Sequence, residues 1–379
     1  MCAILHFVKL IAQLKLLPTP EQADALLRTL ETTNAACNSM SQVAWDAKTF
    51  GKFDLQKLCY APVRERFGLA AQVTIRALAK VADAYKLDTK RLRTFRPHAA
   101  IAYDDRILSY AIPDSSVSIW TLEGRQRIPF VCGTRQRELL ATRQGETDLA
   151  FVRGEWYLFA VCDVDEPDPQ DVDDVIGIDL GRTNIATDSD GTIHSGSTVK
   201  SVRYRHRRLR NRLQKKGTLA AKRRLRKLAG QEYRFAKDVN HTISKRIVRE
   251  AQRTKRAIAL EDLKGIRMRV RARKSQRTVL HSWSFFQLQA YIAYKARQVG
   301  VPVVLVNPRN TSRTCPTCGH SAKANRATQA SFTCVQCGCA GHADTIAAGN
   351  IRVLGRAAVM QPYISESAGR SSQRQAVGL

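Results

Sequence analysis

Hydrophobic and polar residues follow two different periods along this chain, and the period changes several times. Residues 4–16 alternate weakly, as a β-strand does. Over residues 18–90 apolar positions recur every three to four residues, with breaks near Gly51 and Gly68, which predicts a small helical domain. Its first helix should begin at Thr19–Gln22, where a threonine N-cap, a proline at the first helical position and a glutamine at the third follow one another.

A series of short alternating segments follows the helical region. Turn residues separate them, which is typical of a small antiparallel barrel or sandwich. If residues 4–16 supply another strand of this sheet, the helical region is an insertion in it. The acidic, proline-containing residues 166–169 predict a linker to the next domain. The predicted strands are 101–103, 107–111, 117–120, 128–131, 149–152 and 156–164.

Strands and helices alternate after the linker. Three strands come first, then two long basic helices broken near Gly230, and then a strand, a loop, a helix, a strand and a last helix. This order is that of an RNase H-like α/β domain, in which carboxylates at strand ends and on a helix converge on divalent metals. The tail from about residue 360 is polar and patternless, and it should be disordered. The predicted elements are 175–180, 184–188, 192–195, 200–228, 231–254, 256–261, 262–281 (loop), 283–299, 301–306 and 343–354.

Composition indicates the class of partner that the chain binds. The 379 residues suffice for two or more domains, and 62 Lys and Arg against 33 Asp and Glu give a formal net charge of +29. Such an excess of positive charge indicates that the binding partner is a polyanion, and nucleic acid is favoured over a membrane surface. No apolar run of about 18 residues exists and no signal peptide precedes the first strand, so we expect no membrane association.

Four of the ten cysteines form the most specific motif of the chain. Cys315 and Cys318, then Cys334 and Cys337, form two Cys-x-x-Cys pairs with the spacing of a zinc ribbon, and a glycine follows each pair. Four thiolates predict a closed, structural Zn²⁺ site, the alternative being two redox pairs. Cys339 is not expected to be a ligand. The remaining cysteines are scattered, which predicts reduced thiols and a cytoplasmic protein; they are Cys2, Cys37, Cys59, Cys132 and Cys162.

Three carboxylates are the candidate catalytic residues. Asp179 and Glu261 each end a predicted strand, and Asp344 begins the last helix. An aspartate at the end of a buried strand is costly unless it binds a metal, a phosphate or a proton. In the predicted fold the three would hold two Mg²⁺ ions, which leave positions for phosphate oxygens and water. Taken singly, Glu261 is also compatible with a surface turn and Asp344 with a helix-start charge.

Basic residues concentrate in the first long helix and in a later loop. Like charges at this density repel each other, and a polyanion relieves that cost. Such contacts hold nucleic acid without reading its sequence. The candidate nucleic-acid-binding residues are Arg207, Arg208, Arg210, Lys215, Lys216, Arg223, Arg224, Arg269, Arg271 and Arg273.

Taken together, these motifs resemble TnpB, the OrfB-type proteins of bacterial insertion sequences that are related to the type V CRISPR effectors. The resemblance runs through nearly the whole chain and is most specific in the C-terminal half. One departure is Ile346, where the family usually has asparagine, beside the candidate metal ligand Asp344. The segments that carry the resemblance are Leu17–Gln22, Gly177–Gly181, Asp238–His241, Ala259–Leu263, Asn310–Cys315 and Ala343–Ile351.

The resemblance implies an RNA-guided DNA endonuclease. An RNA from the right end of the element would serve as scaffold and guide, with one protein chain per RNA. The protein would recognise a short motif beside the double-stranded target, form an R-loop and cut with Asp179, Glu261 and Asp344. Arg326 occupies the position where the family places an arginine near the scissile phosphate. Action would be at the nucleoid of a prokaryotic cell.

The same resemblance implies a domain layout. A WED-like β-barrel would carry a REC-like helical insertion, and a RuvC-like, RNase H-fold nuclease domain would carry an inserted zinc ribbon that binds target nucleic acid. The expected parts are 1–17 (first strand of the barrel), 18–94 (REC-like), 95–170 (rest of the barrel and linker), 171–311 (RuvC-like), 312–341 (zinc ribbon), 342–355 (last RuvC helix) and 356–379 (tail).

The same residues are compatible with three other functions. The Gly177–Asn184 segment is similar to the first phosphate loop of actin- and Hsp70-like ATPases, but no second glycine-rich phosphate loop follows. An RNA-guided regulator without cleavage would keep the fold, and the three intact carboxylates argue against it. A transposase that joins DNA ends would share the carboxylates, and the inserted ribbon favours the guided nuclease.

Overall fold

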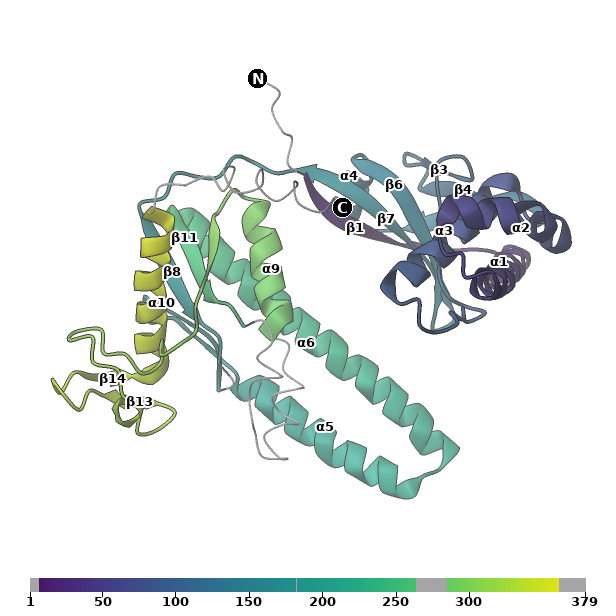
Figure 1. Cartoon of the computed structure of the whole chain (residues 1–379). Helices are drawn as coiled ribbons and strands as arrows, with labels where there is room; N and C mark the ends of the chain where they lie inside the picture. The colour runs from purple at the N-terminus through teal and green to yellow at the C-terminus, as the bar shows by residue number, and fades with distance from the viewer. Residues whose placement is uncertain (1–6, 182, 264–284, 361–379) are drawn as a thin grey trace, which may run out of the picture. The chain divides into compact units, whose positions relative to one another are not determined.

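The structure, a computed structural model, describes residues 7–181, 183–263 and 285–360 (Figure 1). It divides into two compact units, one ending at Asp165 and the other beginning at Glu166. The predicted loop at 262–281 lies outside the described residues from 264 onward. The predicted tail from 361 onward and Cys2 also lie outside them.

The N-terminal unit contains one seven-stranded antiparallel sheet in the order β2-β6-β7-β1-β5-β4-β3. The prediction that residues 4–16 supply a strand is confirmed, because β1 lies in the middle of the sheet and pairs with β7 and β5. The helices between β1 and β2 are therefore inserted in one sheet. The strands are β1 (Phe7–Leu16), β2 (Ile101–Tyr103), β3 (Leu108–Ala111), β4 (Ser116–Thr121), β5 (Gly124–Val131), β6 (Arg143–Val152) and β7 (Glu155–Asp165).

Side chains of the two edge strands bring the ends of this sheet together. The hydroxyl of Tyr103 on β2 donates to the carbonyl of Trp120 on β4 at 3.1 Å. The hydroxyl of Tyr110 on β3 donates to that of Thr147 on β6 at 3.2 Å. The sheet is thus a near-closed barrel, and its interior is filled by fully buried residues such as Leu158.

Three helices fill the insertion, α1 (Pro20–Asp46), α2 (Lys52–Phe67) and α3 (Ala71–Leu87). The predicted start of α1 is confirmed by a capping box, in which Thr19 and Gln22 bond reciprocally through side chain and backbone. Both predicted breaks are also confirmed, since Gly51 caps α2 and Gly68 ends it with a left-handed φ of 62°. The seven-residue helix α4 (Thr134–Leu140) was not predicted, because so short a segment shows no clear period.

The second unit is built on a five-stranded sheet in the order β10-β9-β8-β11-β12. β10, β9 and β8 pair antiparallel, whereas β8, β11 and β12 are parallel. The strands lie where the sequence predicts them and form the sheet of a RuvC-like region. They are β8 (Asp174–Asp179), β9 (Asn184–Asp188), β10 (Ile193–Ser195), β11 (Arg256–Glu261) and β12 (Val303–Val306).

Helices cover both faces of this sheet (Figure 1). α10 (Ala343–Met360) packs on one face, where Val175 and Ala259 are fully buried. The long helix α6 (Leu219–Arg253) and α9 (Phe285–Arg297) cover the other face, over Ile176 and Ile258. Neighbouring residues of β8 and β11 thus face opposite cores, as in a sheet buried on both sides.

Gly177 sets how closely α10 approaches the sheet. A Cβ atom at Gly177 would lie 2.1 Å from the carbonyl oxygen of Ala348 and 2.4 Å from the backbone nitrogen of Arg352. Only a residue without a side chain permits this approach. The start of α10 is thereby brought beside the end of β8.

Two basic helices form a hairpin that extends from the sheet (Figure 1). They are α5 (Ser197–Lys216) and α6 (Leu219–Arg253). The predicted break near Gly230 is wrong, because Gly230 is buried within α6. The break lies at Gly217, which has a left-handed φ of 64°, and Thr218 then caps α6 by accepting from the backbone N–H of Ala221.

The cysteine module is inserted between β12 and α10. It contains the 3₁₀ turn η1 (Lys323–Asn325) and a small hairpin of β13 (Ser331–Thr333) and β14 (Ala340–His342). Gly319 and Gly338 both have left-handed φ angles, as the predicted tight turns require. β14 runs directly into α10, so the module and the last helix are continuous. In the described part of the chain, no helix is both long and apolar enough to cross a membrane.

Candidate active site

The parallel pairing of β8 and β11 places two of the predicted carboxylates side by side. Ile178 is the register partner of Leu260, so the next residues, Asp179 and Glu261, end neighbouring strands at the same edge of the sheet. The turn after Asp179 leads into β9 as an antiparallel hairpin. The proximity of Asp179 and Glu261 therefore follows from the parallel register of β8 and β11.

α10 brings the third carboxylate to this edge. Asp344 is the second residue of α10 and is 6% exposed. The N–H of Ala343 donates to the carbonyl of Ala330 at 2.8 Å, which fixes the start of the helix against the cysteine module. The side chain of Asn184, at the start of β9, donates to Oδ2 of Asp344 at 3.0 Å.

The three carboxylates share one electrostatic environment. Burial, together with the charges of Glu261 and Asp344, raises the pKa of Asp179 to about 7, against the opposing effect of Arg326. Burial also raises the pKa of Glu261, although a hydrogen bond from Thr311 and the charge of Arg326 act to lower it. The effect of Glu261 and Asp344 on Asp179 shows that the site concentrates negative charge. A bound cation would relieve the repulsion between these carboxylates.

Arg326 is the cation that this structure places among the carboxylates. It follows η1 in the cysteine module, and its Nη2 donates to Oδ1 of Asp344 at 2.9 Å and to the carbonyl of Gln329. The carboxylate oxygens are not gathered as closely as the cysteine sulfurs: among the described residues, only the four cysteines form a metal-ligand group with all atoms within 4.8 Å. The guanidinium thus contacts one acid and acts electrostatically on the other two.

Ile346 does not face the carboxylates. It packs against the small apolar cluster of the cysteine module, with Phe332 and Ala343, and its Cδ1 lies close to Gly341. The departure from the usual asparagine therefore changes the contact between α10 and the module. The polar partner of Asp344 on the sheet side is Asn184.

The four predicted zinc ligands converge. Sγ of Cys315 lies 3.5 Å from that of Cys337, and Sγ of Cys318 lies 3.6 Å from that of Cys334. All four sulfurs lie within 4.8 Å of one another. A tetrahedral site with Zn–S bonds of about 2.3 Å has sulfur–sulfur edges of about 3.8 Å, so the cluster is consistent with a zinc ribbon.

Backbone groups of the first knuckle favour the thiolate form. Burial by itself would raise the pKa of Cys315, but hydrogen bonds from the backbone N–H groups of Cys318 and Thr317, together with those from the thiols of Cys337 and Cys318, lower that pKa to about 6. Cys339 is outside the cluster, as predicted. The scattered Cys37, Cys59 and Cys162 are buried free thiols, and Cys132 is half-buried.

The predicted nucleic-acid-binding residues that the structure describes lie on the α5/α6 hairpin. Arg210 is half-buried and forms an ion pair with Glu232 across the hairpin, so part of its charge is used internally. The others are exposed: Arg207, Arg208, Lys215 and Lys216 on α5, and Arg223 and Arg224 on α6. Arg269, Arg271 and Arg273 lie outside the described residues.

Several polar residues of the site were not predicted. Asn184 and Thr311 each bond one carboxylate, and Asn350 holds the segment that carries Thr311. Thr311 and Asn350 lie in segments that carry the family resemblance, and Asn184 lies shortly after one, yet spacing alone gives no reason to single them out. Gln329 of the module also donates to the hydroxyl of Thr183 at 2.8 Å, across the β8–β9 turn.

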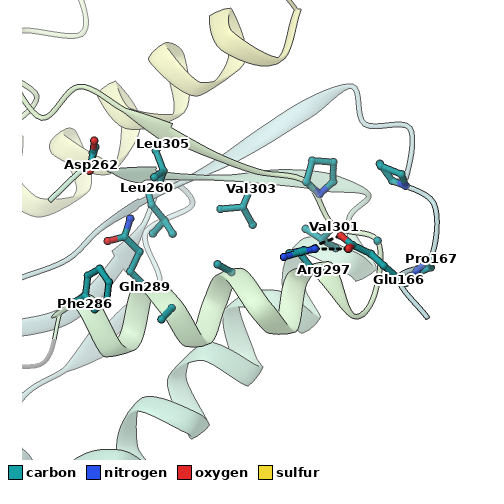
Figure 2. Close-up of a pocket in the computed structure, with 15 residues that line it drawn as sticks. Glu166, Pro167, Leu260, Asp262, Phe286, Gln289, Arg297, Val301, Val303 and Leu305 are labelled. Carbon is teal, nitrogen blue, oxygen red and sulfur yellow. Dashed lines mark hydrogen bonds and ion pairs between the residues drawn. The ribbon is translucent and has the colours of Figure 1, made fainter. Parts of the chain in front are cut away.

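A separate groove lies between α9 and β12, with a volume of about 550 Å³ (Figure 2). Glu166 and Arg297 form a bidentate ion pair at one end, with N–O distances of 2.9 and 2.5 Å, and Asp262 lies at the other. Glu261 does not line it, so the groove is distinct from the carboxylate site. The apolar residues that line it include Pro167, Leu260, Phe286, Val301, Val303 and Leu305.

Two family models match the chain. Residues 159–271 match the OrfB/IS605 model, described as a probable transposase. Residues 285–351 match the TNB domain of Cas12f1-like proteins. The second match includes α9, β12, the cysteine module and Asp344.

Curated relatives cover part of the chain. The TnpB-like protein MJ0751 of Methanocaldococcus jannaschii is 31% identical over 195 residues, which are 48% of this chain and 69% of that protein. The CRISPR-associated endodeoxyribonuclease Cas12f1 of Syntrophomonas palmitatica is 32% identical over 44% of this chain and 36% of its own length. The putative RNA-guided DNA endonuclease InsQ of Escherichia coli is 26% identical over 54% and 55%.

One solved structure shares the fold along most of the chain. It is the cryo-EM structure of a Cas12f1–sgRNA–target DNA complex, with a TM-score of 0.58 and 16% identity over 87% of this chain and 83% of that one. At 16% identity, this similarity is a similarity of fold.

Proposed function

The chain belongs to the TnpB family, and on that basis we propose that it is a transposon-encoded, RNA-guided DNA endonuclease. It binds a guide RNA from its own element, recognises a short motif beside the target and forms an R-loop. It then cuts both DNA strands at one RuvC-type site. Its relatives include proteins named as RNA-guided and CRISPR-associated endonucleases, which supports this proposal.

One observation carries the proposal. Asp179, Glu261 and Asp344 come from two neighbouring strand ends and a helix start, and burial together with the charges of the other two raises the pKa of Asp179. Oxygen ligands of this kind suit Mg²⁺, which uses few carboxylates and keeps positions for phosphate and water. Structural carboxylates have no need to be grouped against their own repulsion.

The three carboxylates would hold two Mg²⁺ ions. Bound there, Mg²⁺ supplies positive charge for activating a water molecule and for the leaving 3′-oxygen. Asn184 keeps Asp344 oriented through Oδ2. Arg326 donates to Oδ1 of Asp344, and it would contact the scissile phosphate when target DNA is bound.

The rest of the molecule fits guide and target binding. We assign the near-closed barrel to a WED-like role and its inserted helices to a REC-like role in holding RNA and reading the adjacent motif. The exposed basic residues of the α5/α6 hairpin would contact phosphates. The cysteine module, with a structural Zn²⁺, would bind target nucleic acid beside the carboxylates.

Two alternatives keep the same fold. A regulator that binds DNA without cutting would not need three intact acids at the sheet edge, and a DNA-joining transposase would not need a guide RNA. The actin- and Hsp70-like alternative is not supported, because family membership assigns the Gly177–Asn184 segment to the RuvC-like hairpin.

Sequencing the RNA that co-purifies with the protein tests the proposal. The protein should be expressed together with its flanking DNA, and one abundant RNA class from the element's right end is expected. The loaded protein should then cut a DNA library with randomised flanks beside a guide-matched site, and surviving flanks identify the motif. A random RNA population, or a library left intact, would contradict the proposal.

A further inference from the structure

Glu261 is held by one side chain from the segment that leads into the cysteine module. The hydroxyl of Thr311 donates to Oε1 of Glu261 at 2.5 Å, within the range of a hydrogen bond to a charged carboxylate. The same hydroxyl lies 3.2 Å from the carbonyl of Pro308. Because a hydroxyl has one proton, the shorter contact with the carboxylate is the stronger one.

Thr311 is itself fixed from α10. The side-chain amide of Asn350 donates to the carbonyls of Thr311 and Thr314 at 2.7 and 2.8 Å. Thr311 is 4% exposed and Asn350 is 9% exposed, so water competes little for these bonds. Since α10 also carries Asp344, one helix orients Asp344 directly and Glu261 through Thr311.

From these contacts we propose that Thr311 is a positioning residue for Glu261. Its hydroxyl occupies one oxygen of the carboxylate and leaves the other available to a divalent cation. Mg²⁺ demands near-ideal octahedral geometry, so a carboxylate with a fixed orientation binds it better than one that rotates. Partners of metal ligands typically contribute 10- to 100-fold to metal affinity. The proposal rests on the proposed function, since it takes Glu261 as a metal ligand.

A purely structural role for Thr311 makes a different prediction. If the hydroxyl only stabilises the turn at 308–311, its removal should lower the melting temperature and leave the cation affinity of the folded protein unchanged. A positioning role should lower the affinity and leave folding intact. The two roles are separable because valine has the shape of threonine without the hydroxyl, and serine keeps the hydroxyl.

Manganese binding to the full-length, zinc-loaded, RNA-free protein tests the proposal. Mn²⁺ prefers the same oxygen ligands as Mg²⁺, and its free ion is counted by electron paramagnetic resonance during a titration. Thr311→Val should weaken binding by about 10-fold or more, and Thr311→Ser should stay within about twofold of wild type. In RNA-loaded protein, Thr311→Val should require more Mg²⁺ for half-maximal cutting and recover at high Mg²⁺.

Controls separate this proposal from the proposed function. Wild-type protein should bind Mn²⁺, and Asp179→Ala should lose that binding. If the wild type does not bind Mn²⁺, or if Asp179→Ala binds it equally well, the assignment of the metal site is wrong. If both hold and Thr311→Val binds like wild type, only the role of Thr311 is wrong. If Thr311→Val and Thr311→Ala both melt early or lose zinc, the hydroxyl is structural and the positioning role is refuted.

Discussion

Asp179 shows how neighbouring groups change the chemistry of one side chain. An aspartate in an unfolded chain has a pKa of about 3.9. In the folded protein, burial and the charges of Glu261 and Asp344 raise its pKa to about 7. The folded state therefore binds a proton between these two values that the unfolded state does not, so folding is favoured at low pH. This contribution is complete below about pH 4 and is lost as pH rises through about 7.

Replacing Asp179 by asparagine should remove this pH dependence. Asparagine has the shape of the protonated acid and carries no charge. The variant should melt at nearly the wild-type temperature at about pH 4 and several degrees higher at about pH 8, in buffer without Mg²⁺, since one pKa unit corresponds to about 1.4 kcal/mol. Thermal melting of both proteins across this range checks the prediction. A difference that stays constant with pH would contradict the raised pKa.

Individual ligands were predictable to different degrees. The cysteine spacing identified four residues that the structure does gather, because each short pair fixes its own geometry. Asp179 and Glu261 could be placed because the predicted element order is that of an RNase H-like domain, in which carboxylates at strand ends converge. The hydrogen bonds of Thr311 and Asn184 depend on how the module packs on the sheet, which no local pattern encodes.

The cysteine module and α10 act as one structural element around the site. β14 continues into α10, and the module supplies Arg326 to Asp344 while the segment before it supplies Thr311 to Glu261. Asn325, fully buried, donates to the carbonyls of Arg313 and His320 and accepts from the N–H of Val335. These bonds hold the two halves of the module together and thereby place Arg326.

A structural zinc ion makes a specific prediction for this element. Cys315→Ser should lower the melting temperature and the bound zinc, because metal binding and folding of such a module are coupled. Cys339→Ser is the matched control, since Cys339 lies two residues after a ligand yet outside the cluster. It should keep one zinc per chain, measured by mass spectrometry. Equal zinc content and melting temperature in both variants would argue against a structural ribbon.

Helix boundaries show where sequence reasoning succeeded and failed. Gly68 and Gly217 both end helices with left-handed backbone, whereas Gly230 lies buried inside α6. Glycine alone therefore does not locate a break. At residue 217 the distinguishing signal is the threonine that follows, which caps the next helix.

The whole chain combines a strongly positive charge with one concentrated group of acids. The charge of +29 suits a protein that must hold both RNA and DNA, and it also attracts polyanions toward an acidic site that would otherwise repel them. The boundary between the two units could be predicted from the acidic, proline-containing linker at residues 166–169. The contacts with RNA and DNA that the proposed function requires depend on the nucleic acid and are not encoded in local sequence patterns.

Cleavage by RNA-loaded protein that lacks the Asp179 carboxylate is the decisive measurement. Wild type and Asp262→Asn, which changes an acid next to Glu261 that faces the separate groove, should both cut target DNA in Mg²⁺. Asp179→Ala should bind guide RNA and target DNA as wild type does in a gel-shift assay and yield no cut product on either strand. Cutting by Asp179→Ala at the wild-type rate would show that the carboxylates at the sheet edge are not the catalytic site.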